Sequence, residues 1–379
     1  MLHDEQEDQN APTDGNELDK IETPNDSQVS ETDDFDEAAN ATLDDVDSDD
    51  FDDGFGDDDS DADDSDESER TPSKKEYVPS SVSKRQTRTY LMKRFETLGI
   101  RPRQKLGQNF LIDLNLLKLL HESAELEPCD VVLEVGTGTG SLTHAMAEQA
   151  AAVVTVEIDP VVQEMAKQEL AGKTNVHFLL TDILRNKNSL KEEVLDLIRQ
   201  ELAVDPSRRF KLCANLPYSI ATPLLSNLLL SDIPPYSMTV TIQKEVADRM
   251  TARPGHKDYG ALSVWMQAMC DTRIVRVMPP SVFWPRPKVD SAIVQVIYNA
   301  KKRATIPDLK YFHSFVRDIF LHRRKFLRSV LCSAFKKQLS KDVVDRVLAE
   351  KGIKETVRAE NLTVRQILAL SEAFRGELN

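Results

Sequence analysis

Residues 130–143 read DVVLEVGTGTGSLT. The first six form a short apolar run typical of a buried strand, and glycines at 136, 138 and 140 follow directly. Glycine accepts the backbone angles of a tight turn and lets a ligand come close to the main chain. The spacing G-x-G-x-G, unlike G-x-G-x-x-G, favours a nucleoside cofactor without a pyrophosphate, such as S-adenosylmethionine. The alternative is a glycine-rich turn that binds no ligand.

Strands and helices alternate around this stretch, which predicts an α/β fold with a parallel sheet wrapped on both faces. From about residue 307 only helices are expected. The expected strands span 130–135, 152–158, 176–180, 210–214, 238–243, 274–277 and 292–298. The expected helices span 87–97, 114–126, 141–150, 160–171, 188–203 with Ser189 as its cap, about 223 onward, 309–335, 340–350 and 363–376.

Charge divides the chain of 379 residues into an acidic tail and a basic body. Residues 1–70 hold 30 acidic side chains against two basic ones, a net charge of −28, whereas residues 71–379 carry 46 basic and 34 acidic side chains, a net charge of +12. A segment this acidic buries too little apolar surface to fold, so residues 1–84 are expected to be disordered. The tail either imitates a nucleic acid and folds back on the body, or is a solvated segment. The basic body predicts a nucleic-acid partner.

Several classes of protein are excluded by the composition. No apolar stretch is long enough for a membrane helix, and the acidic N-terminus resembles neither a secretory signal nor a transit peptide. The four cysteines lie far apart, so we expect no metal site and no disulfide framework. A monomer in a reducing cytoplasm is the expectation.

Two acidic residues at strand ends are candidates for holding the cofactor. Glu157 follows Gly136 by 21 residues, a distance that suits hydrogen bonds to ribose hydroxyls. Asp182 comes just after the strand 176–180, where its carboxylate is placed to accept from an adenine amino group. A simple loop cap is the alternative for Asp182.

The tetrapeptide NLPY, residues 215–218, follows the strand 210–214 and carries the chemistry. Methylation of an adenine amino nitrogen needs acceptors around its hydrogens, so that its lone pair turns toward the methyl donor. The Asn215 side-chain oxygen and a main-chain carbonyl near Leu216 or Pro217 are suitable acceptors. Tyr218 offers a flat face on which an extruded base stacks. The alternative is an ordinary junction between strand and turn.

Three further segments have two interpretations each. Phe283, in the proline-rich segment 279–291, either stacks on the base from the other side or packs in a turn. Residues 243–263 form either a flexible loop at RNA phosphates or a solvated connector. Arg324 and Arg328, expected on one helical face, form either a phosphate-binding surface or a solvated basic face. Lys301, Lys302, Arg303, Lys336 and Lys337 belong to the same expected surface.

Taken in order, the motifs of this chain strongly resemble those of the small-subunit ribosomal RNA adenine dimethyltransferases over about residues 98–370. The motifs are QKLGQNFLID (104–113), EVGTGTGSLT (134–143), VEID (156–159), TDIL (181–184), NLPYSIATPLL (215–225), QKEVADRM (243–250), PGHKDYGALS (254–263), FWPRPKVDS (283–291) and RRKFLR (323–328).

This resemblance implies a Rossmann-like class I S-adenosylmethionine-dependent methyltransferase domain, residues 85–302, and a small all-helical RNA-binding domain, residues 303–379. It implies N6,N6-dimethylation of two adjacent adenosines in the 3′-terminal hairpin of small-subunit (16S) rRNA, and a role in biogenesis on an immature small subunit. By matching position, the cofactor contacts are Asn109, Leu111, Gly136, Glu157, Asp182 and Asn215. Residues Asn215, Leu216, Pro217, Tyr218 and Phe283 hold the target base.

The sequence departs from the family pattern at Thr137, usually Pro, at Ala221, usually Ser, and at Phe326, usually Thr. The segment between Asp182 and Asn215 is also somewhat long. Two other functions compete. A non-catalytic nucleic-acid-binding or assembly factor on the same fold predicts erosion of the glycine turn or of NLPY, and both are intact. A large-subunit rRNA adenine methylase is disfavoured by NLPYSIATPLL and by the segment around 254–263.

Overall fold

The computed structural model describes residues 87–378. The tail expected to be disordered, residues 1–84, lies outside the described residues. So do residues 85–86, at the start of the expected Rossmann-like domain, and residue 379.

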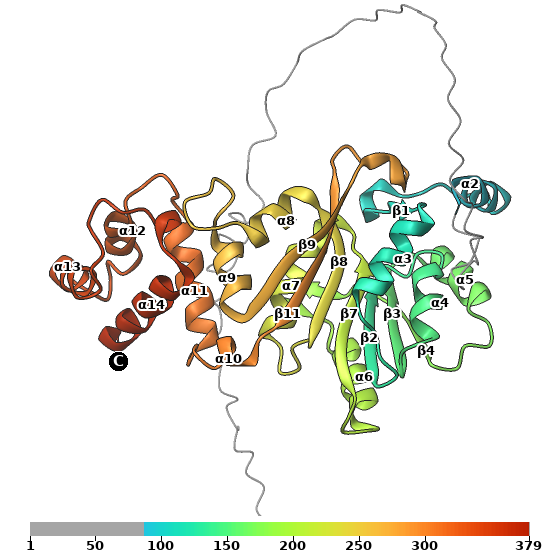
Figure 1. Ribbon diagram of the computed structural model, residues 1–379, viewed down its shortest axis with the longest axis horizontal. Coiled ribbons are helices and arrows are strands. Elements are labelled where there is room, and N and C mark those ends of the chain that lie inside the picture. Colours follow the sequence, from blue (N-terminus) through green and yellow to red (C-terminus); the bar gives the residue numbers. More distant parts are fainter. Residues whose placement is uncertain (1–86, 379) are drawn as a thin grey trace, which may run out of the picture. The chain divides into compact units, whose positions relative to one another are not determined.

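A seven-stranded sheet forms the centre of the described part (Figure 1). Six strands run parallel to one another, and β11 is antiparallel to both of its neighbours. The expected α/β fold is confirmed, but the sheet is mixed where an all-parallel one was expected. Across the sheet the strands are β4 (Val176–Leu180), β3 (Ala152–Glu157), β2 (Asp130–Val135), β7 (Arg209–Asn215), β8 (Ser237–Gln243), β11 (Ser291–Tyr298) and β9 (Cys270–Met278).

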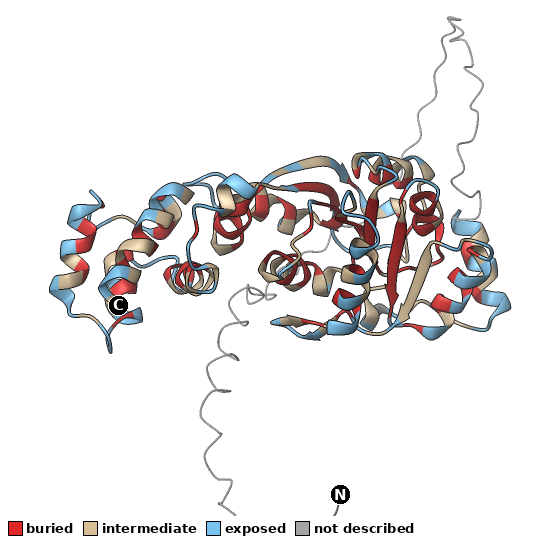
Figure 2. Ribbon diagram, turned by 90° about the horizontal axis from the view of Figure 1, so that it is seen from below, coloured by how far each residue is buried: buried red, intermediate tan, exposed pale blue. Residues whose placement is uncertain are grey.

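Helices cover both faces of this sheet because successive residues of a strand point to opposite sides. Val132 and Val153 pack with side chains of α3 and α4, whereas Val131 and Leu133 pack with α6, α7 and α9. Every residue of β2 is buried, as expected for a strand covered on both faces, and Figure 2 shows the central strands in the buried colour. The helices are α3 (Leu114–Ser123), α4 (Ser141–Ala147), α5 (Pro160–Glu169), α6 (Glu192–Ala203), α7 (Ala221–Leu230), α8 (Lys244–Thr251) and α9 (Ala261–Met269).

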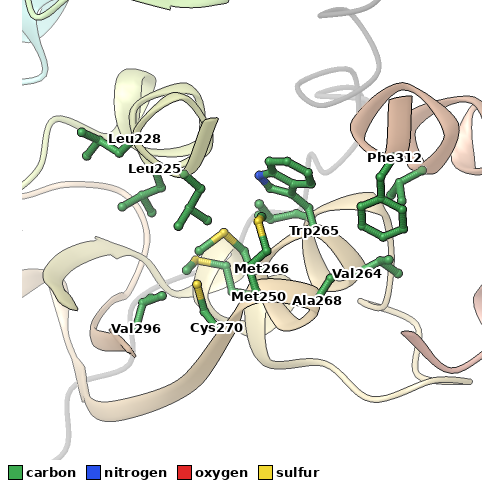
Figure 3. Close-up of a cluster of buried hydrophobic side chains, with 14 of the residues drawn as sticks. Leu225, Leu228, Met250, Val264, Trp265, Met266, Ala268, Cys270, Val296 and Phe312 are labelled. Atoms are coloured by element: carbon green, nitrogen blue, oxygen red, sulfur yellow. The ribbon is translucent and has the colours of Figure 1, made fainter. Parts of the chain in front are cut away.

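The C-terminal part is helical, as expected, and shares a core with the sheet. One apolar cluster runs from Val131 in β2 to Phe374 in the last helix. At the boundary, Trp265 of α9 stacks on Phe312 with ring centroids 6.4 Å apart (Figure 3). These helices are α10 (Ala300–Arg303), α11 (Leu309–Phe320), α12 (Leu327–Ala334), α13 (Lys341–Glu350) and α14 (Val364–Leu378).

Many helices begin at a residue whose side chain accepts from the first turn, which satisfies backbone N–H groups that have no partner within the helix. Asp113, for example, accepts from the N–H groups of Asn115 and Leu116 at 2.9 and 3.1 Å. The other capping side chains are Thr87 before α2 (Arg88–Thr97), Asp159, Asn299, Asp308 and Ser340.

The helix expected over 188–203 with Ser189 as its cap is wrong in its first turn. Residues Leu184–Asn186 (β5) and Ser189–Leu190 (β6) form a small hairpin, and α6 begins at Glu192. The Asn186 side-chain oxygen accepts from the Asn188 N–H at 2.8 Å and from the Ser189 hydroxyl at 3.0 Å. Such local bonds of asparagine compete with helix formation, so a turn forms here.

The single helix expected over 309–335 is broken at residues 321–326, between α11 and α12. Arg323 in this break donates to the carbonyls of Lys257 and Tyr259 at 2.6 and 3.0 Å, and the Leu327 N–H donates to the Val357 carbonyl at 2.8 Å. These contacts with distant segments replace helical bonds. Arg324 and Arg328 therefore do not share a helical face: Arg324 lies in the turn and Arg328 in α12.

Residues 243–263 contain more helix than the loop or connector that we expected, although 252–260 is a connector between two helices. They contain α8 and the start of α9, and Tyr259 between them is fully buried and donates its hydroxyl to the Leu362 carbonyl at 2.9 Å. A two-residue pair of β1 (Phe110–Leu111) with β10 (Phe283–Trp284) was not expected either. Within residues 87–378 no helix is long and apolar enough to cross a membrane.

Candidate active site

A pocket opens at the carboxyl ends of β2, β3, β4 and β7, where an open α/β sheet usually binds its ligand. It brings together every residue predicted to contact a cofactor, from five separate segments of the chain. The predicted residues in its lining are Asn109, Leu111, Gly136, Glu157, Asp182, Asn215 and Pro217.

The glycine turn forms one wall of this pocket. Gly136 and Gly140 have φ angles of 84° and 82°, in the left-handed region that strains other residues. A Cβ atom at Gly136 would lie 3.5 Å from Cδ of Pro217 and 3.7 Å from the main-chain oxygen of Asn215. The turn after β2 and the tetrapeptide after β7 therefore lie side by side, and it is the positive φ of Gly136 that favours glycine there.

Glu157 lies at the end of β3, where its carboxylate accepts three backbone N–H groups. Gly138 donates at 3.1 Å, Ile158 at 3.1 Å and Asp159 at 3.0 Å. Burial raises the pKa of Glu157, and these hydrogen bonds oppose the rise. The bonds fix the carboxylate in the pocket with lone pairs left for a further donor.

Glu134 is a pocket residue that the sequence analysis missed. It is 1% exposed and accepts from the hydroxyls of Thr143 and Thr155, both at 2.6 Å. Burial raises its pKa to about 8, against the effect of these hydrogen bonds. Thr137, which departs from the family pattern, joins the same group because its hydroxyl lies 2.7 Å from that of Thr155. The feature of the sequence that could have identified Glu134 is an acidic residue between the apolar residues Leu133 and Val135 of a buried strand.

Asn215 is held by one end of its side chain. Its Nδ2 donates to the main-chain oxygen of Asn109 at 2.9 Å, and only the amide nitrogen can make this bond. The side-chain oxygen thus points away from Asn109, and none of the described residues donates to it. Pro217 is confined by the glycine turn and by Gly107, at which a Cβ atom would lie 3.1 Å from Cβ of Pro217.

Three residues predicted to hold a base lie outside the pocket lining. Leu216 is 2% exposed and its N–H donates to the Thr241 carbonyl at 3.2 Å. Tyr218 is half-buried, with its hydroxyl 2.6 Å from that of Ser291. Phe283 is 2% exposed in an apolar cluster with Leu111. The base-holding roles of these residues stay predictions.

Asp182 is exposed and lines the pocket. Its Oδ1 accepts from the Leu184 N–H at 2.9 Å, which is the loop-cap contact considered as the alternative. That bond uses one lone pair of one oxygen, so the carboxylate can cap the loop and still accept from a ligand.

Gln108 is a second residue that the sequence analysis missed. Its Nε2 donates to Asp159 at 2.9 Å, and its Oε1 accepts from the Arg103 N–H at 2.7 Å. Gln108 thus ties the loop before β1 to the cap of α5, directly beside Asn109. No group of three potential metal ligands occurs within residues 87–378.

Comparison with known proteins places these features in one family. The family model described as ribosomal RNA adenine dimethylase matches residues 99–375. A protein of Alkaliphilus oremlandii named ribosomal RNA small subunit methyltransferase A is 40% identical over 275 residues, which cover 73% of this chain and 92% of that protein. The protein of the same name from Ligilactobacillus salivarius is 39% identical over 280 residues, covering 74% and 92%.

Two solved structures are similar over nearly their whole length. A dimethyladenosine transferase from Plasmodium falciparum has a TM-score of 0.58 and 25% identity, covering 70% of this chain and 97% of that one. The 23S rRNA methyltransferase ErmE has a TM-score of 0.51 and 25% identity, covering 70% and 99%.

Proposed function

The chain belongs to the ribosomal RNA adenine dimethylase family, and from that membership we propose that it methylates two adjacent adenosines in the 3′-terminal hairpin of small-subunit rRNA. As a member, it is an S-adenosylmethionine-dependent rRNA adenine dimethyltransferase with a Rossmann-like fold. The observation that supports the proposal is that Gly136 of the glycine turn and Asn215 and Pro217 of the tetrapeptide line one pocket. The proposed cofactor wall and the proposed base-recognition wall thus belong to the same pocket.

The residues of the pocket fit S-adenosylmethionine. The space that a Cβ at Gly136 would fill allows close approach to the main chain, and Glu157 is positioned to accept from ribose hydroxyls. Asp182 is assigned to the adenine amino group, and Asn109 and Leu111 to the side of the pocket nearest Asn215. When bound, the cofactor supplies an electrophilic methyl group on a sulfonium.

Asn215 orients the nucleophile. Its side-chain oxygen, left free by the bond from Nδ2 to Asn109, accepts from an amino hydrogen of the target adenine. A carbonyl near Leu216 or Pro217 accepts from the other hydrogen. Together these acceptors favour a pyramidal amino nitrogen whose lone pair points into the pocket. No side-chain base is required, because the methylated ammonium is acidic enough to release its proton to water.

The base itself is assigned to Tyr218 and Phe283. The bond between the hydroxyls of Tyr218 and Ser291 fixes the tyrosine ring at the edge of the site, where one face can receive a splayed-out adenine. Phe283 is buried by Leu111 and its neighbours, so its assignment requires that the β1–β10 pair shift when RNA binds.

The helical domain, residues 303–379, is assigned to RNA binding. Lys301, Arg324, Lys336 and Lys337 are exposed, and none of them forms an ion pair within the described residues. The other predicted cations are occupied: Lys302 pairs with Asp271 at 2.8 Å, Arg328 with Asp345, and Arg303 donates to the Ile306 carbonyl at 2.7 Å. The phosphate-binding surface is therefore smaller than the sequence alone predicts.

The decisive experiment supplies the purified chain with labelled S-adenosylmethionine and either unmethylated small subunits or large subunits, and then maps the modified bases. We expect label on N6 of two neighbouring adenosines of the small-subunit RNA alone. Label on the large subunit would favour a large-subunit rRNA adenine methylase, and no label on either subunit would favour a non-catalytic factor.

We further propose that the enzyme acts as a monomer, in the cytoplasm, on immature subunits. Sedimentation of the chain alone tests whether it is a monomer, and comparison of immature with mature subunits as substrates tests which of them it methylates.

A further inference from the structure

The turn between α11 and α12 exposes an aromatic ring. Phe326 is 47% exposed, whereas the other five phenylalanines of this domain are buried: Phe312, Phe315, Phe320, Phe335 and Phe374. The exposed ring stands immediately before α12, as its N-terminal flanking residue. Because the residue is half exposed, packing in the core does not account for the ring.

The turn that carries this ring is fixed at both ends. Arg323 donates to the carbonyls of Lys257 and Tyr259 and to Glu360 at 3.2 Å, which ties the turn to the loop between α8 and α9. After the ring, the Leu327 N–H donates to the Val357 carbonyl, and Leu327 itself is fully buried. Figure 1 shows α11 and α12 beside that loop. The ring is thus presented by an ordered backbone, which lowers the entropy lost when a ligand binds.

Two exposed cationic residues adjoin the ring in sequence. Arg324 and Lys325 directly precede it, both are exposed, and neither forms an ion pair or side-chain hydrogen bond within the described residues. Arg328, which follows, is neutralised by Asp345, and Arg323 is used for anchoring. If an apolar protein surface packed on Phe326, it would bury the charges of Arg324 and Lys325 without giving them partners. Burying unpaired charges costs free energy. A ligand with a flat ring and a phosphate satisfies all three side chains.

We propose that this turn binds an unpaired nucleotide of the small-subunit rRNA, with its base stacked on Phe326 and its flanking phosphates contacting Arg324 and Lys325. This inference rests on the proposed function for the identity of the RNA. It adds a second recognition point, on the helical domain, at which unpaired RNA is held independently of the adenine in the pocket. Aromatic stacking beside cations is the general chemistry of single-strand recognition.

The test measures equilibrium affinity of the full-length chain for unmethylated small subunits at several salt concentrations. Phe326→Ala is expected to weaken binding about 10-fold, the order for loss of one stacked base. Phe326→Tyr should bind like the parent, and Phe326→Leu, which keeps apolar area without a π face, should resemble Phe326→Ala. Arg324→Ala should also weaken binding and reduce the slope of log K against log salt by about 1, whereas Phe326→Ala leaves that slope unchanged.

Two controls separate this proposal from folding and from the function itself. Phe326 is exposed, so its variants should keep the parental Tm, and Val204→Ala, a substitution at the 66% exposed residue that follows α6, should change neither Tm nor affinity. With saturating subunits, Phe326→Ala should retain the parental kcat. Parental affinity in Phe326→Ala, or full affinity in Phe326→Leu, overturns the stacking proposal. Absence of methyl transfer by the parent chain would instead overturn the proposed function.

Discussion

The two ends of the Asn215 side chain have different tasks. Nδ2 donates to the Asn109 carbonyl and so fixes the orientation of the amide, while the oxygen, to which no described residue donates, is the atom that we propose accepts from the substrate. An acceptor held in place before the reaction begins costs no reorganisation in the transition state. This is why an amide suits the position better than a freely rotating hydroxyl of serine.

We predict that Asn215→Ala lowers methyl transfer by at least about 100-fold, the order for loss of one preorganised transition-state hydrogen bond. Binding of S-adenosylmethionine, measured by calorimetry, should change little, because the glycine turn and Glu157 remain. Asn215→Asp is the matched variant: it keeps an acceptor but cannot donate to Asn109, so it should also be impaired. Near-parental turnover in Asn215→Ala would refute the assigned role.

Glu134 predicts a specific dependence of stability on pH. Its pKa is raised from 4.5 to about 8 because the charged form is buried. Between pH 4.5 and 8 the folded chain therefore keeps a proton on Glu134 that the unfolded chain has released. The free energy of unfolding should fall as the pH rises through this range. Glu134→Gln, which stays neutral, should reduce this fall by a few kcal/mol.

The measurement is Tm, or the free energy of unfolding in urea, from pH 5 to 9 for the parent and the variant. Glu122→Gln changes an exposed carboxylate on α3 and serves as the control for the loss of one negative charge. If the curves for the parent and Glu134→Gln remain parallel over this range, Glu134 is already ionised in the folded protein.

The sequence predicted the pocket residues that occur at a regular spacing after strands, and it missed the pocket residues that can be recognised only from their neighbours in space. Gly136, Glu157 and Asn215 stand at strand ends in a repeated order, and all three line the pocket. Glu134 was missed because no sequence motif marks it. Its role becomes visible only when the structure shows which hydroxyl groups donate to it. Gln108 was missed because its partner Asp159 is remote in sequence.

At the scale of elements, the loop before β1 has no regular structure beyond one short 3-10 turn and depends on side chains for its position. Gln108 bonds to Asp159 and to the Arg103 N–H, and the next residue supplies the carbonyl that holds Asn215. We therefore propose that Gln108 is a positioning residue, which acts on the substrate only through Asn109 and Asn215.

We predict that Gln108→Ala raises KM for S-adenosylmethionine and lowers kcat, each by up to about 10-fold, since a net hydrogen bond contributes about 1 kcal/mol. Gln108→Glu should be worse, because a second carboxylate then faces Asp159. Gln168→Ala, which removes an exposed bond to Arg94, is the control and should leave both constants unchanged. A purely structural role would instead lower Tm and the active fraction with KM unaltered.

The elements that sequence predicted well are those fixed by local pattern. The strands 130–135 and 176–180 begin and end where expected, because each is an apolar run between turn residues. The direction of β11 was not predictable, since an apolar strand has the same pattern in either orientation. The break between α11 and α12 depends on Arg323 and its partners in the α8–α9 loop, which no helical periodicity records.

At the scale of the whole molecule, the two halves of the described chain share one apolar core. Trp265 of α9 contacts both Phe312 and His313 of α11, and α9 is buried on most sides. Because α9 packs both on the sheet and on the helical domain, it couples the position of one to that of the other. The exposed cations of the C-terminal helices are thereby held in a fixed relation to the sheet that carries the pocket.

Charge supplies the last prediction. Residues 1–70 carry −28 and the rest of the chain +12, and the segment precedes the family match, which begins at residue 99. A tethered polyanion competes with RNA for exposed cations such as Arg324 and Lys336, because tethering gives it a high effective concentration. Deleting residues 1–70 should therefore tighten binding to small-subunit RNA at low salt. The gain should vanish toward 0.5 M salt, where the screening length falls to about 4 Å.

The control for this prediction is a full-length chain in which Asn and Gln replace the acidic residues within 44–69. It separates the effect of charge from the effect of length, and its affinity should match that of the deletion. Equal affinities of all three chains at low salt would mean that the tail remains solvated and leaves the basic surface open.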